Sequence, residues 1–126
     1  MEQREGFFEG PGGARLYHQA WLPQGEVRAV LGIVHGLAEH SGRYMNLVNR
    51  FVPRGYAVYG IDHLGHGRSE GQRLYVRRFT DFTGPLQGYF DMIRQRQQGK
   101  PVFLVGHSLG GLIGRASCRE REFAVV

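Results

Sequence analysis

Three short, nearly uninterrupted apolar runs constrain the fold of this chain more than any other feature. They occupy Ala29–Val34, Tyr56–Ile61 and residues 102–105. A strand that is apolar at almost every position is buried on both faces, which is typical of parallel sheets covered by helices. Parallel strands also need a crossover between them, and this crossover is usually a helix. The runs therefore predict an α/β fold.

The segments between these runs carry helical spacing. In residues 44–51 the apolar side chains recur at positions i, i+3, i+4 and i+7, and residues 53–55 (Pro-Arg-Gly) close the helix. Residues 79–93 show similar spacing, and Gln98 and Gly99 are expected to end that helix.

Pro85 decides where we expect the second helix to begin. Proline fits the first helical turn best, so we expect a start near Gly84, with Thr80 or Thr83 as the cap.

An antiparallel hairpin is expected before the first apolar run. Residues 6–9 lead into a Gly-Pro-Gly-Gly turn, and residues 16–22 alternate between two faces. Leu16 and Ala20 share one face of this strand, and Trp21 lies on the other.

Length and composition indicate one globular domain. The chain has 126 residues, of which 41% are hydrophobic and 21% charged. Its net charge of +5 comes from fifteen scattered arginines and Lys100 without interleaved aromatics, so we expect no nucleic-acid partner.

No apolar run approaches a membrane span, and the charged start lacks the apolar core of a signal peptide. We expect a cytoplasmic protein, and the single Cys118 agrees with a reducing compartment.

The strongest chemical signal is the sequence Gly-His-Ser-Leu-Gly-Gly at residues 106–111, directly after an apolar run. A G-x-S-x-G pattern between a strand and a helix indicates a nucleophile elbow, whose sharp turn exposes the serine hydroxyl above the sheet. Glycines two positions before and after the serine let the strand and helix pass closely. We interpret Ser108 as the catalytic nucleophile, supported by Gly106 and Gly110. The alternative is an ordinary strand–turn–helix corner that contains a serine.

Two backbone N–H groups are candidates for an oxyanion hole. The N–H of Leu109 belongs to the first turn of the helix after the serine, where N–H groups lack intrahelical partners. The N–H of Leu37 belongs to the loop after Ala29–Val34, which supplies the second donor in this architecture. Gly36 lets that loop turn close to a substrate. His35 is expected to be a hydrogen-bonded structural residue rather than a base.

Residues 62–71 follow the second apolar run, and we interpret them as a rigid loop that braces the floor of the site. Their glycines are spaced G-x-G-x-x-x-G, one residue longer than a dinucleotide fingerprint. A metal site is a further alternative, but no recognised ligand spacing supports it. The candidate ligands would be Asp62, His63, His66 and His35. We expect neither a metal nor a cofactor.

Together these segments resemble the monoacylglycerol lipase and lysophospholipase group of α/β-hydrolases, which is serine aminopeptidase S33-like. The similarity covers residues 6–113, and its motifs lie at residues 35–44, 54–58, 62–71 and 106–111. It implies the α/β-hydrolase fold and hydrolysis of carboxyl esters in monoacylglycerols or lysolipids. It maps the nucleophile to Ser108 and the oxyanion donors to Leu37 and Leu109. It also allows peripheral membrane contact through a lid that would lie beyond residue 126.

The resemblance further implies an Asp or Glu and then a His on strands after the nucleophile. Eighteen residues follow Ser108, and they contain two glutamates and no histidine. We therefore expect residues 1–113 to be the N-terminal part of an α/β-hydrolase domain, and the chain itself to be inactive or nearly so. Truncation would also leave residues 102–105 as an unpaired apolar edge, which favours aggregation.

Residues 114–126 differ in character from the rest of the chain. The helix after the elbow should stay apolar toward the sheet beyond Ile113, and instead the sequence becomes polar and basic. Residues 113–121 resemble the translation of a widely used sequencing-adapter oligonucleotide in one reading frame. We expect a non-native tail, and a natural truncated paralogue is the alternative.

Three functional hypotheses follow. The first is a lipid-ester hydrolase that uses a serine nucleophile in the full-length parent. The second is a peptidase or a different esterase of the same fold, and the third is a non-catalytic remnant.

Overall fold

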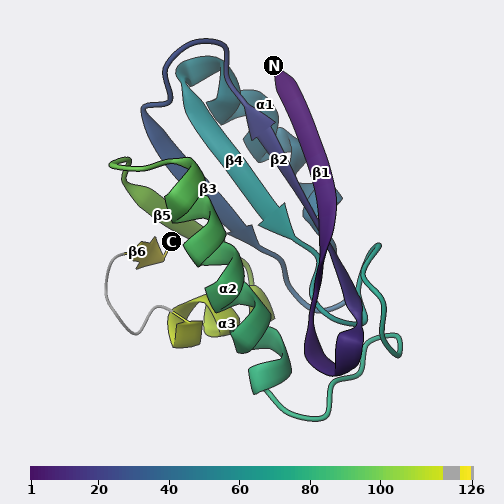
Figure 1. Ribbon diagram of the computed structural model, residues 1–126. Coiled ribbons are helices and arrows are strands. Elements are labelled where there is room, and N and C mark those ends of the chain that lie inside the picture. Colours follow the sequence, from purple (N-terminus) through teal and green to yellow (C-terminus); the bar gives the residue numbers. More distant parts are fainter. Residues whose placement is uncertain (118–122, 126) are drawn as a thin grey trace.

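The computed structural model describes residues 1–117 and 123–125, which form one sheet with helices on both faces (Figure 1). The strands are β1 (Glu2–Glu9), β2 (Arg15–Leu22), β3 (Ala29–Val34), β4 (Tyr56–Ile61), β5 (Val102–Gly106) and β6 (Phe123–Val125). The helices are α1 (Met45–Phe51), α2 (Thr80–Arg96) and α3 (Leu109–Ser117), with 3₁₀ turns at Pro11–Gly13, Ser41–Tyr44 and Val52–Arg54.

The sheet has the strand order β1-β2-β4-β3-β5-β6 within the described residues. The three apolar runs form its centre, where β3 lies between β4 and β5 and runs parallel to both. The hairpin of β1 and β2 joins β4 in antiparallel register. The prediction of an α/β fold from the apolar runs is therefore confirmed.

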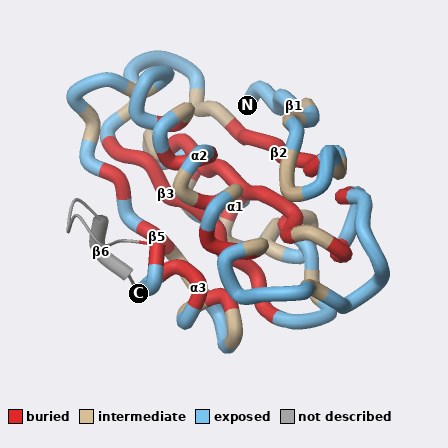
Figure 2. Tube along the Cα trace, turned by 60° about the horizontal axis from the view of Figure 1, so that its bottom comes forward, coloured by how far each residue is buried: buried red, intermediate tan, exposed pale blue. Residues whose placement is uncertain are grey.

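The sheet separates two apolar cores. Helices α2 and α3 cover one face, and α1 covers the other (Figure 1). Leu16 and Ala20 of β2 pack in the core with α2, whereas Trp21 packs in the core with α1. The alternation expected for residues 16–22 is confirmed by this division. Figure 2 shows that the buried stretches follow the inner strands.

The expected start of α2 at Gly84 was wrong. The helix begins at Thr80 and contains Pro85, and no threonine side chain caps it. Its first turn is closed by the N–H groups of Phe82 and Thr83, which both donate to the Phe79 carbonyl. Phe82 is buried and its ring lies 5.2 Å from that of His63, so burial of this side chain outweighs the local preference of proline.

The C-terminal region also differs from expectation. Helix α3 continues to Ser117, and its buried residues after Ile113 are Gly114 and Ser117, neither of which has a large apolar side chain. Strand β5 is not the unpaired edge that we expected, because β6 pairs with it in parallel. Phe103 of β5 nevertheless keeps 37% of its surface exposed, so this strand is not buried on both faces. Cys118 lies outside the described residues.

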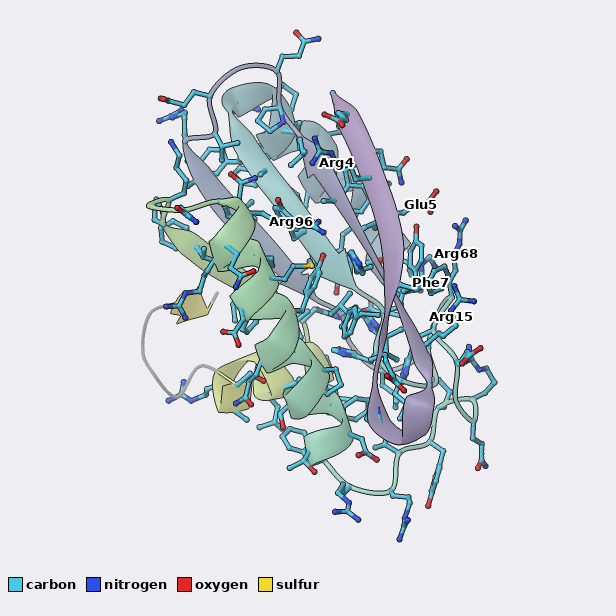
Figure 3. The ribbon with its side chains drawn as sticks, viewed as in Figure 1. Arg4, Glu5, Phe7, Arg15, Arg68 and Arg96 are labelled. Atoms are coloured by element: carbon cyan, nitrogen blue, oxygen red, sulfur yellow. The ribbon has the colours of Figure 1, made fainter. Side chains whose placement is uncertain are left out.

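Strand β1 forms the opposite edge of the sheet and carries charged side chains (Figure 3). Glu5 pairs with Arg68 at 3.2 Å and accepts a hydrogen bond from the Tyr17 hydroxyl at 2.6 Å. Arg15 lies over the ring of Phe7, with its guanidinium carbon 4.1 Å from the ring centroid. Charged edge strands resist pairing with other chains. The Glu5–Arg68 ion pair also joins the loop after β4 to the hairpin.

We expect Leu104→Ala to lower the free energy of unfolding by about 2–5 kcal/mol, because it leaves a cavity between β5 and the helices. Leu104 is fully buried, whereas Leu112 on α3 is 59% exposed and makes Leu112→Ala a matched control. Urea denaturation of the two variants measures the difference. Equal losses would contradict the placement of Leu104 in the core.

Candidate active site

Ser108 occupies the turn between β5 and α3. Its φ of +58° lies in the left-handed region, which side-chain-bearing residues rarely adopt. The Gly111 N–H donates to the Ser108 carbonyl at 3.0 Å, so the strained residue belongs to the hydrogen-bonded first turn of the helix. The Ser108 side chain is exposed at the edge of the sheet where β3 and β5 end. Strained backbone conformations are concentrated at functional sites, so the strain at this exposed serine makes it a candidate functional residue.

The two elbow glycines stand where backbone segments nearly touch. A Cβ on Gly110 would lie 1.9 Å from the Val34 carbonyl oxygen, and one on Gly106 would lie 2.6 Å from the Cα of Gly111. Gly36 approaches the elbow from β3, since a Cβ there would lie 2.9 Å from the His107 carbonyl oxygen and 3.5 Å from the Cβ of Ser108. The loop after β3 therefore lies against the serine.

The Leu37 and Leu109 backbone N–H groups flank this point. Within the described part of the chain, neither N–H has a hydrogen-bond acceptor. Leu37 precedes Ala38, whose φ of +62° places it in the left-handed region. Two free N–H groups beside a nucleophile are the arrangement that stabilises a developing oxyanion.

Glu39 links the loop after β3 to its surroundings. Its Oε1 accepts hydrogen bonds from the Gly36 N–H at 2.7 Å and the Tyr44 hydroxyl at 2.9 Å, and lies 3.4 Å from Nδ1 of His107. The Gly36 N–H hydrogen bond, more than any other contact, lowers the pKa of this carboxyl. Burial beside Glu39 raises the pKa of the Tyr44 hydroxyl. The sequence reasoning did not single out Glu39, although an acid three residues after a loop glycine can bond back to its N–H.

The floor of the site is a buried group of histidine rings. His35 and His63 lie 4.1 Å apart between ring centroids, and His66 lies 5.2 Å from His35. The His35 ring has Nδ1 2.7 Å from the Gly36 carbonyl and accepts from the His63 N–H at 3.0 Å. These contacts fix it as a neutral imidazole. Burial lowers the pKa of His35 to about 4 and that of His63 well below its ordinary value.

Asp62 holds the loop after β4 through its two carboxylate oxygens. One accepts from both the N–H and the hydroxyl of Ser41 at 2.7 Å, and the other accepts from the Arg68 N–H at 3.0 Å. Ser69 donates its hydroxyl to the Asp62 carbonyl. Asp62, His35 and His63 thus bond to neighbouring protein groups, whereas His66 has its Nδ1 3.0 Å from the Leu64 carbonyl and a buried Nε2 without a partner. In residues 1–117 and 123–125, no group of three His, Cys, Asp or Glu is placed to hold a metal ion.

A base for Ser108 is not present in the described residues. No histidine there hydrogen-bonds to the serine hydroxyl, and His107 has its Nδ1 against Glu39. His35 and His63 are hydrogen-bonded to the backbone beneath the elbow. The site therefore combines an exposed serine and two free N–H groups without a general base.

The sequence also matches a known protein family. The sequence model described as "Serine aminopeptidase, S33" matches residues 25–125. The chain belongs to this family. Among curated relatives, it is 38% identical to the monoacylglycerol lipase of Mycolicibacterium smegmatis, covering 82% of this chain and 37% of that protein. It is also 38% identical to the human monoglyceride lipase, covering 86% of this chain and 36% of that protein.

Solved structures show the same fold. A carboxyl esterase from Bacillus coagulans superposes with a TM-score of 0.84 at 24% identity, covering 94% of this chain and 40% of that one. A soluble variant of the monoglyceride lipase from Saccharomyces cerevisiae, in complex with a substrate analogue, gives a TM-score of 0.76 at 24% identity. It covers 88% of this chain and 37% of that one. The chain has the α/β-hydrolase fold and spans about a third of the length of its curated relatives.

We expect Gly110→Ala to destabilise the chain by about 3 kcal/mol or more, because the new methyl group meets backbone carbonyls that cannot move aside. Gly111→Ala is the matched control, since its Cβ would come no closer than 3.7 Å to its neighbours. It should stay within about 1 kcal/mol of the wild type, as alanine favours a helix. Urea denaturation distinguishes them. A tolerated Gly110→Ala would contradict the close packing of α3 on β3.

The buried histidines make stability depend on pH. His35 titrates at about pH 4 in the folded chain and near 6.5 when unfolded, so the unfolded state binds more protons between these values. Stability should therefore rise as the pH increases from about 4 to 6.5. The urea concentration at the midpoint of unfolding, measured across this pH range, should rise less steeply with pH in His35→Gln than in the wild type. His40→Gln, at an exposed position, should keep the slope, and an unchanged slope in His35→Gln would refute the assignment.

Proposed function

We propose that this chain is the N-terminal part of a serine hydrolase that cleaves the carboxyl esters of lipids, namely monoacylglycerols or lysophospholipids. The observation that carries the proposal is Ser108, exposed at positive φ on the elbow beside the free N–H groups of Leu37 and Leu109. The substrate class is supported by the printed names of the relatives, which are monoacylglycerol and monoglyceride lipases.

The chemistry starts at the serine hydroxyl. Ser108 Oγ attacks the ester carbonyl carbon, and the carbonyl oxygen becomes an oxyanion that the Leu37 and Leu109 N–H groups stabilise. A histidine outside this chain takes the serine proton and returns it to the departing alcohol, oriented by an acid that is also outside it. Water then hydrolyses the acyl-enzyme ester and releases the fatty acid. The chain supplies the nucleophile and the oxyanion hole, so by itself it is inactive or nearly so.

The chain's boundaries are part of the proposal. We assign residues 1–113 to the hydrolase domain and residues 114–126 to a non-native tail, on the change of composition at Ile113. Against this boundary, α3 continues to Ser117, β6 pairs with β5, and the family match extends to residue 125. The share of the relatives that the chain spans supports a fragment. Among the described residues, no helix is long and apolar enough to cross a bilayer. We place the parent in the cytoplasm, with membrane contact through its lid.

A second candidate function comes from the family description, which names an aminopeptidase. In that case Ser108 would attack an amide carbonyl with the same oxyanion donors. The segment of the parent that shapes the acyl pocket would determine which of the two substrates, ester or amide, is accepted. A non-catalytic remnant is the third candidate.

The test is to resequence the gene across codon 113 and express the frame that results. If the frame continues into an Asp and a His, the longer protein should hydrolyse monoacylglycerol, and Ser108→Ala should lower kcat by about 10⁴-fold or more. The 126-residue chain, assayed in parallel, should stay near background. A genomic stop after residue 126, or turnover that survives Ser108→Ala, would overturn the lipase proposal. Faster cleavage of aminoacyl amides than of esters would favour the peptidase.

A further inference from the structure

The loop that presents the Leu37 N–H is a strained turn. The Glu39 N–H donates to the Gly36 carbonyl at 3.2 Å, which closes a four-residue turn with Leu37 and Ala38 at its centre. Positive φ at the third residue of such a turn normally calls for glycine or asparagine, and this turn has Ala38 at +62°. An alanine held in this conformation is strained, because its Cβ crowds the following carbonyl oxygen. Another interaction must therefore stabilise the turn.

The Glu39 side chain supplies that interaction. Its carboxylate accepts the Gly36 N–H, so Gly36 and Glu39 are joined by two hydrogen bonds, one through the backbone and one through the side chain. The Leu37 N–H makes no hydrogen bond to an acceptor in the described residues. A charged acceptor makes a stronger hydrogen bond than a neutral one, which suits a strained loop.

Two further contacts anchor Glu39 to the rest of the site. The Tyr44 hydroxyl donates to it from the start of the α1 region, and His107 faces it from the residue before the nucleophile. The carboxylate therefore bridges the loop after β3, the approach to α1 and the elbow. Of the three groups that face it, Gly36 and Tyr44 donate from close range, and His107 lies further away at 3.4 Å.

We propose that Glu39 is a positioning residue of the oxyanion hole: its carboxylate holds the turn of residues 36–39 against the elbow and keeps the Leu37 N–H free beside Ser108. This inference rests on the proposed function, because the value of a free N–H lies in stabilising an oxyanion. Glu39 acts through the loop and does not touch the substrate.

The first arm of the test measures the loop itself and needs no activity. In the 126-residue chain, NMR should show a Gly36 amide proton shifted downfield and protected from exchange by the carboxylate. Glu39→Ala should remove both features and shift the Leu37 resonance, while core amides such as that of Leu104 keep their protection. Glu39→Gln retains an acceptor oxygen and should restore much of the Gly36 protection. Glu26→Gln removes an exposed carboxylate elsewhere and should change none of these signals.

The second arm measures the reactivity of Ser108 with a fluorophosphonate probe at pH 9, followed by intact-protein mass. The serine oxygen forms a bond to phosphorus, fluoride leaves, and the proton goes to hydroxide, so the missing histidine is not needed. Loss of one oxyanion donor costs about 10²–10³ in rate, and loosening its loop should cost about 10-fold or more. We expect that loss in Glu39→Ala, a smaller one in Glu39→Gln and Tyr44→Phe, and none in Glu26→Gln. Ser108→Ala gives the blank.

The two experiments distinguish a failure of the positioning role of Glu39 from a failure of the proposed function of Ser108. If Glu39→Ala leaves the Gly36 and Leu37 signals and the phosphonylation rate unchanged, the positioning role is refuted. If the wild type reacts no faster than the Ser108→Ala blank, the oxyanion hole alone does not activate Ser108 in this chain. The proposed function is then tested by Ser108→Ala in the longer protein, and the NMR arm decides whether Glu39 holds the turn. If Glu39→Ala does not fold, Glu39→Gln and Tyr44→Phe are compared with the wild type instead. Wild-type amide signals and a wild-type phosphonylation rate in both variants would refute the positioning role.

Discussion

The geometry at this edge of the sheet depends on one close approach, that of the first turn of α3 to the end of β3. Gly110 lies against the carbonyls of Val34 and His35 so closely that no side chain fits between them. The His107 N–H reaches the Val34 carbonyl at 3.3 Å and continues the pairing of β5 with β3 up to the turn. With the strand and the helix both fixed to β3, the connecting residue has little freedom. The positive φ of Ser108 is the conformation that joins them, and it lifts the side chain out of the sheet.

The layer beneath this approach contains two buried histidine rings and an acid that accepts several hydrogen bonds. The ends of β3 and β4 meet beneath the elbow, where His35 and His63 exchange hydrogen bonds through ring and backbone atoms. Burial disfavours a charge on either ring and lowers both pKa values. Asp62 lies at this level, and its oxygens accept three hydrogen bonds from Ser41 and Arg68. The floor is thereby rigid without contributing a base.

How far the sequence predicts these features depends on whether the signal is local. Apolar runs and the G-x-S-x-G spacing are local, and they placed β3, β4, β5 and the elbow correctly. The predicted start of α2 was wrong. Proline favours the first turn of a helix, but Phe82, which precedes Pro85, packs against the loop after β4 and lies within the helix. The pairing of β6 with β5 joins segments about twenty residues apart, which neither segment encodes alone. Glu39 was missed because its contact with His107 spans 68 residues, although its bond to Gly36 spans only three.

The distribution of groups along the chain separates two contributions to catalysis. In the proposed function, the segments that follow β3 and β5 would supply the backbone donors and the nucleophile, and packing sets their positions. An oxyanion hole without its base retains a rate advantage of about 10³–10⁴ over water in serine hydrolases, which is a small part of the whole. In the proposed function, proton transfer would depend on a histidine that is not among the described residues. The packing of α3 against β3 fixes the position of Ser108 independently of that histidine, because Gly110 lies directly against the Val34 and His35 carbonyls.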